Sequence, residues 1–173
     1  MRETTLFVTH CSGKKNGTGG PLTLYTSPRV QRFGNACKST GVRWAILSAE
    51  HGLFLPSESH DPYDTALHFS GGECFIFKGE PPLLDPESKN HIKSLIGRIG
   101  NSLKQVSIHR VVFYVGGAPQ RVCSYLLVMH QALNNCTKKH DSPNDVLNCI
   151  KNTSSFCIAS SLAELEEEIQ KIV

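Results

Sequence analysis

The densest group of chemically capable residues follows a short apolar run, residues 44–47, that has the composition of a buried strand. Ser48, Glu50, His51 and Gly52 come at once after this run. In an open α/β sheet, ligands are held just beyond the carboxyl ends of the strands. A carboxylate, an imidazole and a glycine at such a point therefore form a candidate site.

A second polar group lies a short way downstream, where Asp61, Tyr63 and Asp64 flank a proline. Carboxylates on a long loop after a buried strand can act as general bases or can stabilise positive charge. The alternative is that Gly52 only ends a strand, His51 is a surface histidine and residues 62–64 form an ordinary turn. The spacing alone leaves both interpretations open.

The β-rich residues 4–9 predict a first strand, and Cys11, Ser12, Lys14 and Lys15 follow it, ahead of a glycine-rich loop. The order of glycines and lysines excludes a Walker phosphate loop. The lysines, with free loop amides, can still offer positive charge at a strand end, or they can form a solvated basic turn. Cys11 can be a nucleophile, although a buried structural thiol is the favoured interpretation.

Two helix starts have the features of ligand-holding corners. Ser27 is a predicted N-cap before Pro28, so Tyr25 and Ser27 can face a ligand there, although capping alone explains Ser27. The strand predicted at residues 111–115 ends in two glycines, and a helix is predicted from about residue 119 to 135. Four residues belong to this second corner and can contact a phosphate or a base edge: Gly116, Gly117, Gln120 and Arg121.

Residues 65–82 show no clear period and carry Phe69, Phe75 and Phe77 among glycines, which predicts a long lid or binding loop. A helix is predicted to open at residues 85–87, and a last strand and helix at residues 156–159 and 162–172. No structural element is predicted for the polar residues 134–155, and no zinc-ligand spacing occurs, so neither a metal nor a cofactor is expected.

The 173 residues fit one domain, residues 1–173, with 39% hydrophobic and 19% charged residues. Alternating strands and helices predict a single-domain three-layer α/β/α sandwich with a mostly parallel sheet. The net charge of +3 permits nucleic-acid binding without requiring it. Seven cysteines without a Cys-x-x-Cys pair, no signal sequence and no membrane-length segment predict reduced, mostly buried thiols in a cytoplasmic protein of undetermined oligomeric state.

The segment from Ile46 to Leu53, followed by Pro62 and Tyr63, resembles the Leu-Ser-x-x-Tyr/His-Gly-Leu…Pro-Tyr signature of the YaaA family. It resembles still more a family of small YaaA-related proteins, in which Cys-Ser/x-x-Lys and Leu-Tyr-x-Ser precede that signature. Here these motifs are residues 11–14 and 24–27. The Cys…Lys…Tyr-x-x-Ser order is also similar to the archaeosine synthase catalytic module, in which a lysine attacks a nitrile on a modified base. The chain departs from these patterns in the loop between the lysines and Tyr25 and in Asp64, where YaaA has a basic residue.

The resemblance implies handling of nucleobases in nucleic acid, DNA more than RNA, on a fold similar to uracil-DNA glycosylases. It implies a DNA glycosylase that releases a flipped, modified base; the expected base is a bulky modified cytosine of the kind phages carry, and the expected role is anti-phage defence. The residues expected to act are the carboxylate of Asp64, then that of Asp61 or Glu50. Other expected roles are stacking by Tyr25, Tyr63 and Phe69, edge reading by Ser48, His51 and Gln120, and phosphate binding by Lys14, Lys15 and Arg121. The alternatives are a covalent lysine nucleophile, Lys14 or Lys15, and a YaaA-like DNA-binding protein without catalysis.

Overall fold

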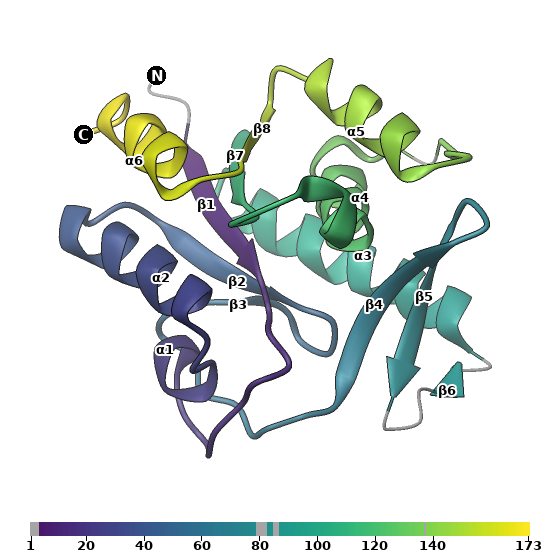
Figure 1. Cartoon of the computed structure of the whole chain (residues 1–173), viewed down its shortest axis with the longest axis horizontal. Helices are drawn as coiled ribbons and strands as arrows, with labels where there is room; N and C mark the ends of the chain where they lie inside the picture. The colour runs from purple at the N-terminus through teal and green to yellow at the C-terminus, as the bar shows by residue number, and fades with distance from the viewer. Residues whose placement is uncertain (1–3, 79–82, 85–86, 137) are drawn as a thin grey trace.

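A five-stranded sheet in the order β3-β2-β1-β7-β8 forms the centre of the molecule (Figure 1). Its strands are β1 Thr5–His10, β2 Trp44–Ser48, β3 Gly52–Phe54, β7 Arg110–Tyr114 and β8 Phe156–Ala159. All neighbours pair in parallel except β3, which returns antiparallel to β2. The computed structural model describes residues 4–78, 83–84, 87–136 and 138–173.

The three central strands are apolar runs buried on both faces, as strands of a helix-covered parallel sheet must be. The register pairs His10 with Leu47 and Thr9 with Tyr114. The carboxyl ends of β1, β2 and β7 therefore lie at one edge of the sheet, and the residues that follow them start from neighbouring points.

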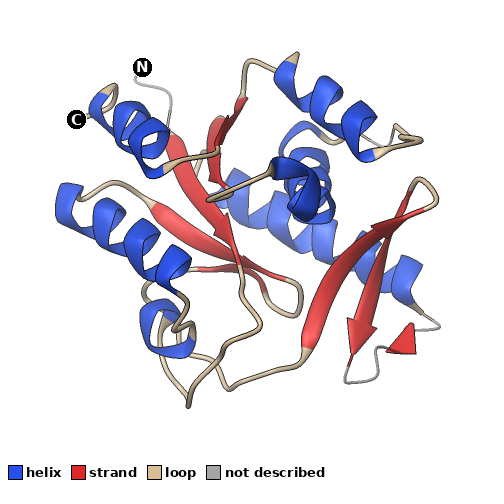
Figure 2. Cartoon of the chain, viewed as in Figure 1, coloured by secondary structure: helices blue, strands red, loops and turns tan. Residues whose placement is uncertain are grey.

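Two groups of helices accompany the sheet (Figure 2). The helices are α1 Pro21–Leu24, α2 Pro28–Thr40, α3 Ser88–Gln105, α4 Cys123–Asn134, α5 Pro143–Lys151 and α6 Leu162–Gln170, with a 3-10 turn η1 at Pro119–Val122. Helix α2 contacts β1 and α6, which itself contacts β7 and β8. Helix α3 contacts β3 and α4, and α5 contacts α4 and β8. The fold is thus mixed α/β with a mostly parallel sheet.

The predicted long loop after residue 64 is wrong. Strands β4 Thr65–Ser70 and β5 Glu73–Lys78 form an antiparallel hairpin, and β6 Leu83–Leu84 adds to β5. The turn is Gly71–Gly72, where both residues have positive φ, as a two-residue hairpin turn requires. Residues 79–82 lie outside the described part of the chain. Apolar residues on both faces of the hairpin hid the alternation of a strand pair.

Other boundaries also differ from expectation. Helix α5 was not predicted, because its few apolar residues lie within a polar stretch, although Ser142 caps it and Pro143 opens it. The single helix predicted from residue 119 begins instead as η1 and turns α-helical at Cys123. The predicted helix start at residues 85–86 lies outside the described residues, and α3 begins at Ser88.

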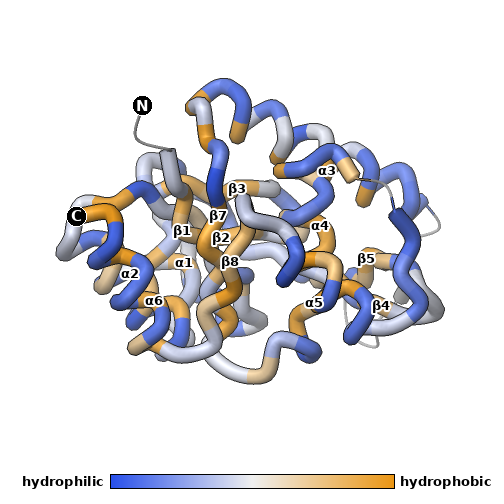
Figure 3. The backbone as a smooth tube through the Cα atoms, turned by 90° about the horizontal axis from the view of Figure 1, so that it is seen from above, coloured by the Kyte–Doolittle hydropathy of each residue, from blue (hydrophilic) through white to orange (hydrophobic). Residues whose placement is uncertain are grey.

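Hydrophobic residues gather in the central strands and hydrophilic ones on the outer turns of the helices (Figure 3). All seven cysteines are free thiols, of which three are buried and four half-buried. Among the helices that the structure describes, none has the length and apolar character needed to cross a membrane.

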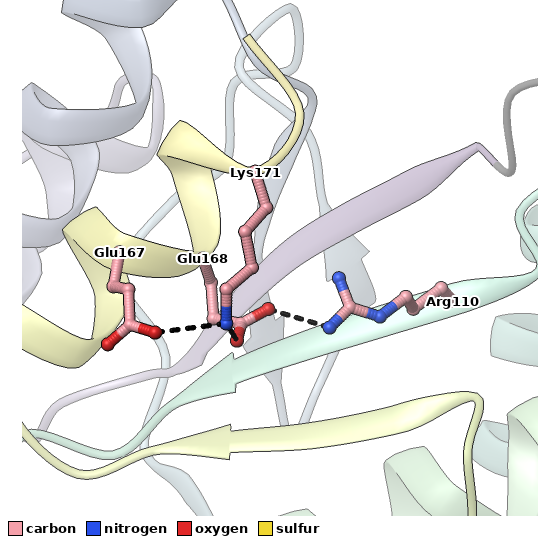
Figure 4. A network of polar contacts seen from close by, with 4 residues as sticks. All are labelled: Arg110, Glu167, Glu168 and Lys171. Atoms are coloured by element: carbon pink, nitrogen blue, oxygen red, sulfur yellow. Dashed lines mark hydrogen bonds and ion pairs between the residues drawn. The ribbon is translucent and has the colours of Figure 1, made fainter.

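An ion-pair network ties the last helix to the sheet (Figure 4). Glu168 on α6 accepts from Arg110 at the start of β7 at 2.6 Å and from Lys171 at 2.6 Å, and Lys171 also reaches Glu167 at 3.1 Å. Burial alone would raise the pKa of the Glu168 carboxyl, but the hydrogen bonds from Lys171 and Arg110 outweigh it and hold the pKa below its ordinary value. The network therefore favours the charged carboxylate.

Candidate functional site

Two loops converge beyond the carboxyl ends of β1 and β2. The loop after β1 carries Lys15, whose backbone bridges to Tyr25, and Gly19, whose backbone pairs with His60 on the loop before β4. A side-chain hydrogen bond from Thr18 to Asp61 joins the same two loops. The lysine-bearing loop and the Asp61–Asp64 loop are thus side by side.

Buried hydroxyl groups form the floor between these loops. The Tyr25 ring is fully buried, and its hydroxyl is hydrogen-bonded to that of Tyr63, which is half-buried. The Ser48 hydroxyl contacts both phenols and accepts from the backbone N–H of Glu50 at 3.2 Å and of His51 at 2.9 Å. Burial, and after it the nearby Cys11, raise the pKa of both phenols, so they remain protonated hydrogen-bond donors.

Cys11 lies on this floor where β1 ends. Its Sγ is 3.3 Å from the Tyr125 hydroxyl, which also accepts from the backbone N–H of Leu67 in β4 at 3.3 Å. Tyr125 is buried on α4, and burial raises the pKa of its phenol. One hydroxyl thus connects the first strand, the fourth helix and the hairpin.

Arg29, in the first turn of α2, reaches across to the end of β1. It donates to the Thr9 hydroxyl and to the backbone carbonyls of His10 at 2.8 Å and Cys11 at 3.3 Å. Its side chain lies against Gly116, where a Cβ would come within 2.8 Å of it. Burial and the nearby Arg29 cation lower the pKa of His10 to about 3, which keeps that imidazole neutral.

Aromatic rings and a lysine form the side of the site towards solvent. The Lys15 Nζ lies 4.3 Å from the centre of the Tyr63 ring, a cation–π contact. The rings of His51 and His60 stack at 3.9 Å with their planes 5° apart, and Tyr63 meets His51 edge-on at 5.0 Å. Burial and the neighbouring His60 lower the pKa of His51, whose Nε2 is buried without a hydrogen-bond partner among the described residues.

The three predicted carboxylates differ in their surroundings. Glu50 is half-buried; its Oε2 accepts from the Thr65 hydroxyl at 2.6 Å, and its backbone carbonyl accepts from Arg98 at 3.2 Å. Asp61 is exposed and held by Thr18, and Asp64 is exposed. Only Glu50 combines partial burial with a fixed orientation.

Some predicted roles do not fit the structure. The predicted stacking role of Tyr25 is wrong, because its ring is fully buried. The predicted stacking role of Phe69 does not fit either, because its ring lies on the inner face of the hairpin against the core. Ser27 caps α2 by accepting from the Val30 N–H at 3.5 Å, so its hydroxyl is engaged there.

The remaining predicted residues lie around the centre. Ser12 is half-buried and donates to the carbonyl of exposed Lys14 at 3.3 Å, and Gly52 opens β3. The four predicted residues after β7 are all exposed: Gly116, Gly117, Gln120 and Arg121.

Three residues of the centre were missed from the sequence. A cation in the first turn of a helix opposes the macrodipole, so Arg29 directly after Pro28 was a signal that something else holds it there. A tyrosine on an apolar helix face needs a partner for its hydroxyl, which was the signal for Tyr125. No sequence feature marked His60.

A cleft of about 700 Å³ lies away from this centre, at the amino end of the sheet. Thr4, Trp44 and Ile108 are among the residues that line it. The cleft shares no residue with the candidate site, whose residues are joined by hydrogen bonds and ring contacts and do not line a deep cavity. Within the described residues, no group of three or more His, Cys, Asp or Glu residues is arranged to hold a metal ion.

Comparison with protein-family models shows that residues 6–73 match a family of unknown function, DUF6884. The match spans less than half of the chain, from β1 into the hairpin, and includes Cys11, Ser48 and Tyr63 but not Tyr125. No curated protein and no solved structure matches the chain. The matched residues therefore include most of the candidate site, and the family description gives no activity.

Proposed function

We propose that this protein is a DNA glycosylase that hydrolyses the N-glycosidic bond of a modified base. The observation that supports the proposal is the carboxylate of Glu50, which is half-buried and held in one orientation by Thr65. Glu50 follows Ser48 by two residues and directly precedes His51, so it adjoins the buried hydroxyl groups and the aromatic rings at the strand ends. Cleavage of an N-glycosidic bond builds positive charge on the sugar. A fixed carboxylate can stabilise that charge and activate a water molecule.

The centre offers the other parts that this reaction needs. A base that leaves the duplex must be held by stacking and by hydrogen bonds to its edge. The Tyr63 ring and the His51–His60 stack provide aromatic walls, and the protonated Tyr63 hydroxyl is a donor. Lys15, beside the Tyr63 ring, is placed to pair with a phosphate.

The more specific form of the proposal is a bulky modified cytosine as the base and defence against phages as the role. It takes the helix groups α2–α6 and α3–α4–α5 to be the outer layers of a three-layer α/β/α sandwich, the architecture that the resemblance to base-releasing enzymes implies.

Glu50→Gln tests the assignment of the carboxylate, with Asp64→Asn as its competitor and Asp61→Asn as the exposed control. Wild-type protein is incubated with DNAs of differing cytosine modification, and released bases are identified by mass spectrometry and abasic sites by alkaline cleavage. We expect base release from a modified DNA and a loss of about 10²- to 10⁴-fold for Glu50→Gln. Equal rates for Glu50→Gln and wild type, with loss in Asp64→Asn, would transfer the role to Asp64. No release from any of these DNAs would refute the glycosylase.

A second candidate function is covalent catalysis by a lysine, which the position of Lys15 over Tyr63 favours. Borohydride trapping of a protein–DNA adduct, abolished by Lys15→Gln and retained by Lys14→Gln, would support it. Salt-sensitive DNA binding without base release or adduct would instead indicate a purely DNA-binding protein.

A further inference from the structure

The β4–β5 hairpin stands apart from the five-stranded sheet and begins at the candidate site (Figure 1). Thr65, its first residue, donates to Glu50. Further along, the backbone of Leu67 is fixed on both sides, since its N–H donates to Tyr125 and its carbonyl accepts from the Ser124 hydroxyl at 3.3 Å. The hairpin is therefore a fixed extension of the site.

The two faces of this hairpin differ. Leu67 and Ile76 are buried on the inner face, against the helices. On the outer face the register places His68 opposite Phe75 and Ala66 opposite Phe77. The rings of Phe75 and Phe77 are partly exposed, and neither packs against the core of the described residues.

These outer rings form an aromatic strip, defined by His68, Phe75 and Phe77. The His68 and Phe77 rings meet edge-on at 5.1 Å. Phe75 and Phe77 are two residues apart on one strand, so their rings follow each other along the hairpin by about 7 Å. A water-facing strand usually carries polar residues at such positions, and partly exposed rings in a row instead suit a ligand with flat π-faces.

The charges at the tip of the hairpin, where the strip ends, favour a polyanion. Within residues 65–78, all of which the structure describes, the acidic residue is Glu73, and it pairs with Lys89 of α3 at 3.2 Å. A cleft of about 190 Å³ at the tip of the hairpin is lined by Glu73 and by Lys89, Lys138 and Lys139. Lys89 is neutralised by Glu73, and the backbone of Asp141 lies against Gly72 at the tip, so Lys138 and Lys139 leave this end of the hairpin with one net positive charge.

We propose that the aromatic strip is a stacking platform for the bases of single-stranded nucleic acid, with the lysines at the hairpin tip holding its phosphates. Flat rings with adjacent positive charge bind single strands without sequence preference, since every base has a π-face. The proposal rests on the proposed function in taking nucleic acid as the ligand. It adds that an unpaired strand runs from the site along the hairpin.

The test compares binding of a fluorescein-labelled oligothymidine and of inorganic polyphosphate, which has charge without bases, by fluorescence anisotropy. The double variant Phe75→Leu/Phe77→Leu keeps apolar bulk but removes the π-faces. We expect it to weaken oligothymidine binding by about 5- to 150-fold and to leave polyphosphate binding unchanged. Phe77→Trp retains stacking, and its added fluorescence is expected to be quenched by oligothymidine.

Two controls separate the alternatives. Val106→Ala changes an exposed apolar side chain far from the hairpin and is expected to bind both probes like wild type. Lys138→Gln/Lys139→Gln is expected to weaken both probes and to reduce the salt dependence. Oligothymidine binding by the leucine variant at wild-type strength would overturn the proposal. A wild-type dimer in sedimentation that the leucine variant abolishes would make the strip a self-interface and would also overturn it.

Binding and base release are measured separately, so the two proposals can fail separately. Stacking on oligothymidine without release of any base would leave the platform standing and refute the glycosylase. If Phe75→Leu/Phe77→Leu releases base and binds oligothymidine as well as wild type does, the stacking platform is refuted and the glycosylase proposal stands.

Discussion

Tyr125→Phe is the sharpest test of how the site is assembled, because it removes one oxygen atom and keeps the ring. That oxygen accepts from the Leu67 N–H and lies 3.3 Å from Cys11 Sγ. Leu67 is 7% exposed, so its N–H is left in a largely dry environment when the acceptor is lost. A buried unsatisfied donor costs about 1–3 kcal/mol, whereas the weak thiol contact adds little.

We therefore expect Tyr125→Phe to lower the free energy of unfolding by about 1–3 kcal/mol. With a urea dependence of about 2 kcal/mol per M, the unfolding midpoint moves down by about 0.5–1.5 M. Amide hydrogen exchange provides the local measurement, in which the Leu67 amide loses protection more than amides of β1. Tyr114→Phe is the matched control, because the hydroxyl of this buried tyrosine has no hydrogen bond among the described residues.

An unchanged midpoint, or a Leu67 amide that exchanges as slowly as in wild type, would show that the hairpin is not held through this hydroxyl. Equal losses in Tyr125→Phe and Tyr114→Phe would likewise refute the reasoning, since only one of the two removes a hydrogen bond to the hairpin.

Further predictions concern charge, pH and the hairpin turn. Glu168→Gln should lower the free energy of unfolding by about 2 kcal/mol through the loss of charge-assisted hydrogen bonds, and Glu167→Gln, which is exposed, by less than about 0.5. Because the pKa of Glu168 is lowered on folding, the difference between wild type and Glu168→Gln should be full above about pH 4.5 and shrink as pH falls, as read from urea midpoints. His10 has its pKa lowered from 6.5 to about 3, so the unfolded chain binds the extra proton and stability falls as pH decreases through that window. His10→Gln should reduce the dependence of the free energy of unfolding on pH by up to about 1.4 kcal/mol per pH unit. The dependence that remains comes from the other histidines with lowered pKa values. If the variant and wild type show the same dependence between pH 6.5 and 5, the prediction is wrong. Gly72→Ala should destabilise more than Gly71→Ala, because both have positive φ but only the Cβ at 72 would come within 2.8 Å of a backbone carbonyl oxygen; thermal unfolding of the pair checks this.

The sequence predicted the parts of the fold that depend on strong local patterns. Apolar runs predicted β2 and β7, β-rich residues predicted β1, and the cap Ser27 with Pro28 predicted α2, since all these signals come from neighbouring residues. The hairpin was missed because Phe75 and Phe77 face outwards, which breaks the alternation that identifies a strand. Edge strand β3 has three residues, too few for a period to show.

The centre could be predicted only in part, for a related reason. Ser48, Glu50 and His51 follow a recognisable strand end, so their chemistry could be located from the sequence. Tyr125 contacts Cys11 across 114 residues, and such a contact is set by helix packing rather than by any local signal. The burial of Tyr25 is also a tertiary property, and it changes that ring from a stacking surface into a structural donor.

The central place of β1 has a consequence for how the chain folds during synthesis. This strand pairs on one side with β2 and on the other with β7, whose partner residues lie 105 positions later in the chain. At about 5–20 residues per second, the ribosome delivers β7 some 5–20 s after β1. Until then one edge of an apolar strand stays open, and contacts of such long sequence separation also form slowly. A chaperone that binds β1 on the nascent chain would therefore raise the yield of native protein more than a chaperone that acts after the chain has left the ribosome.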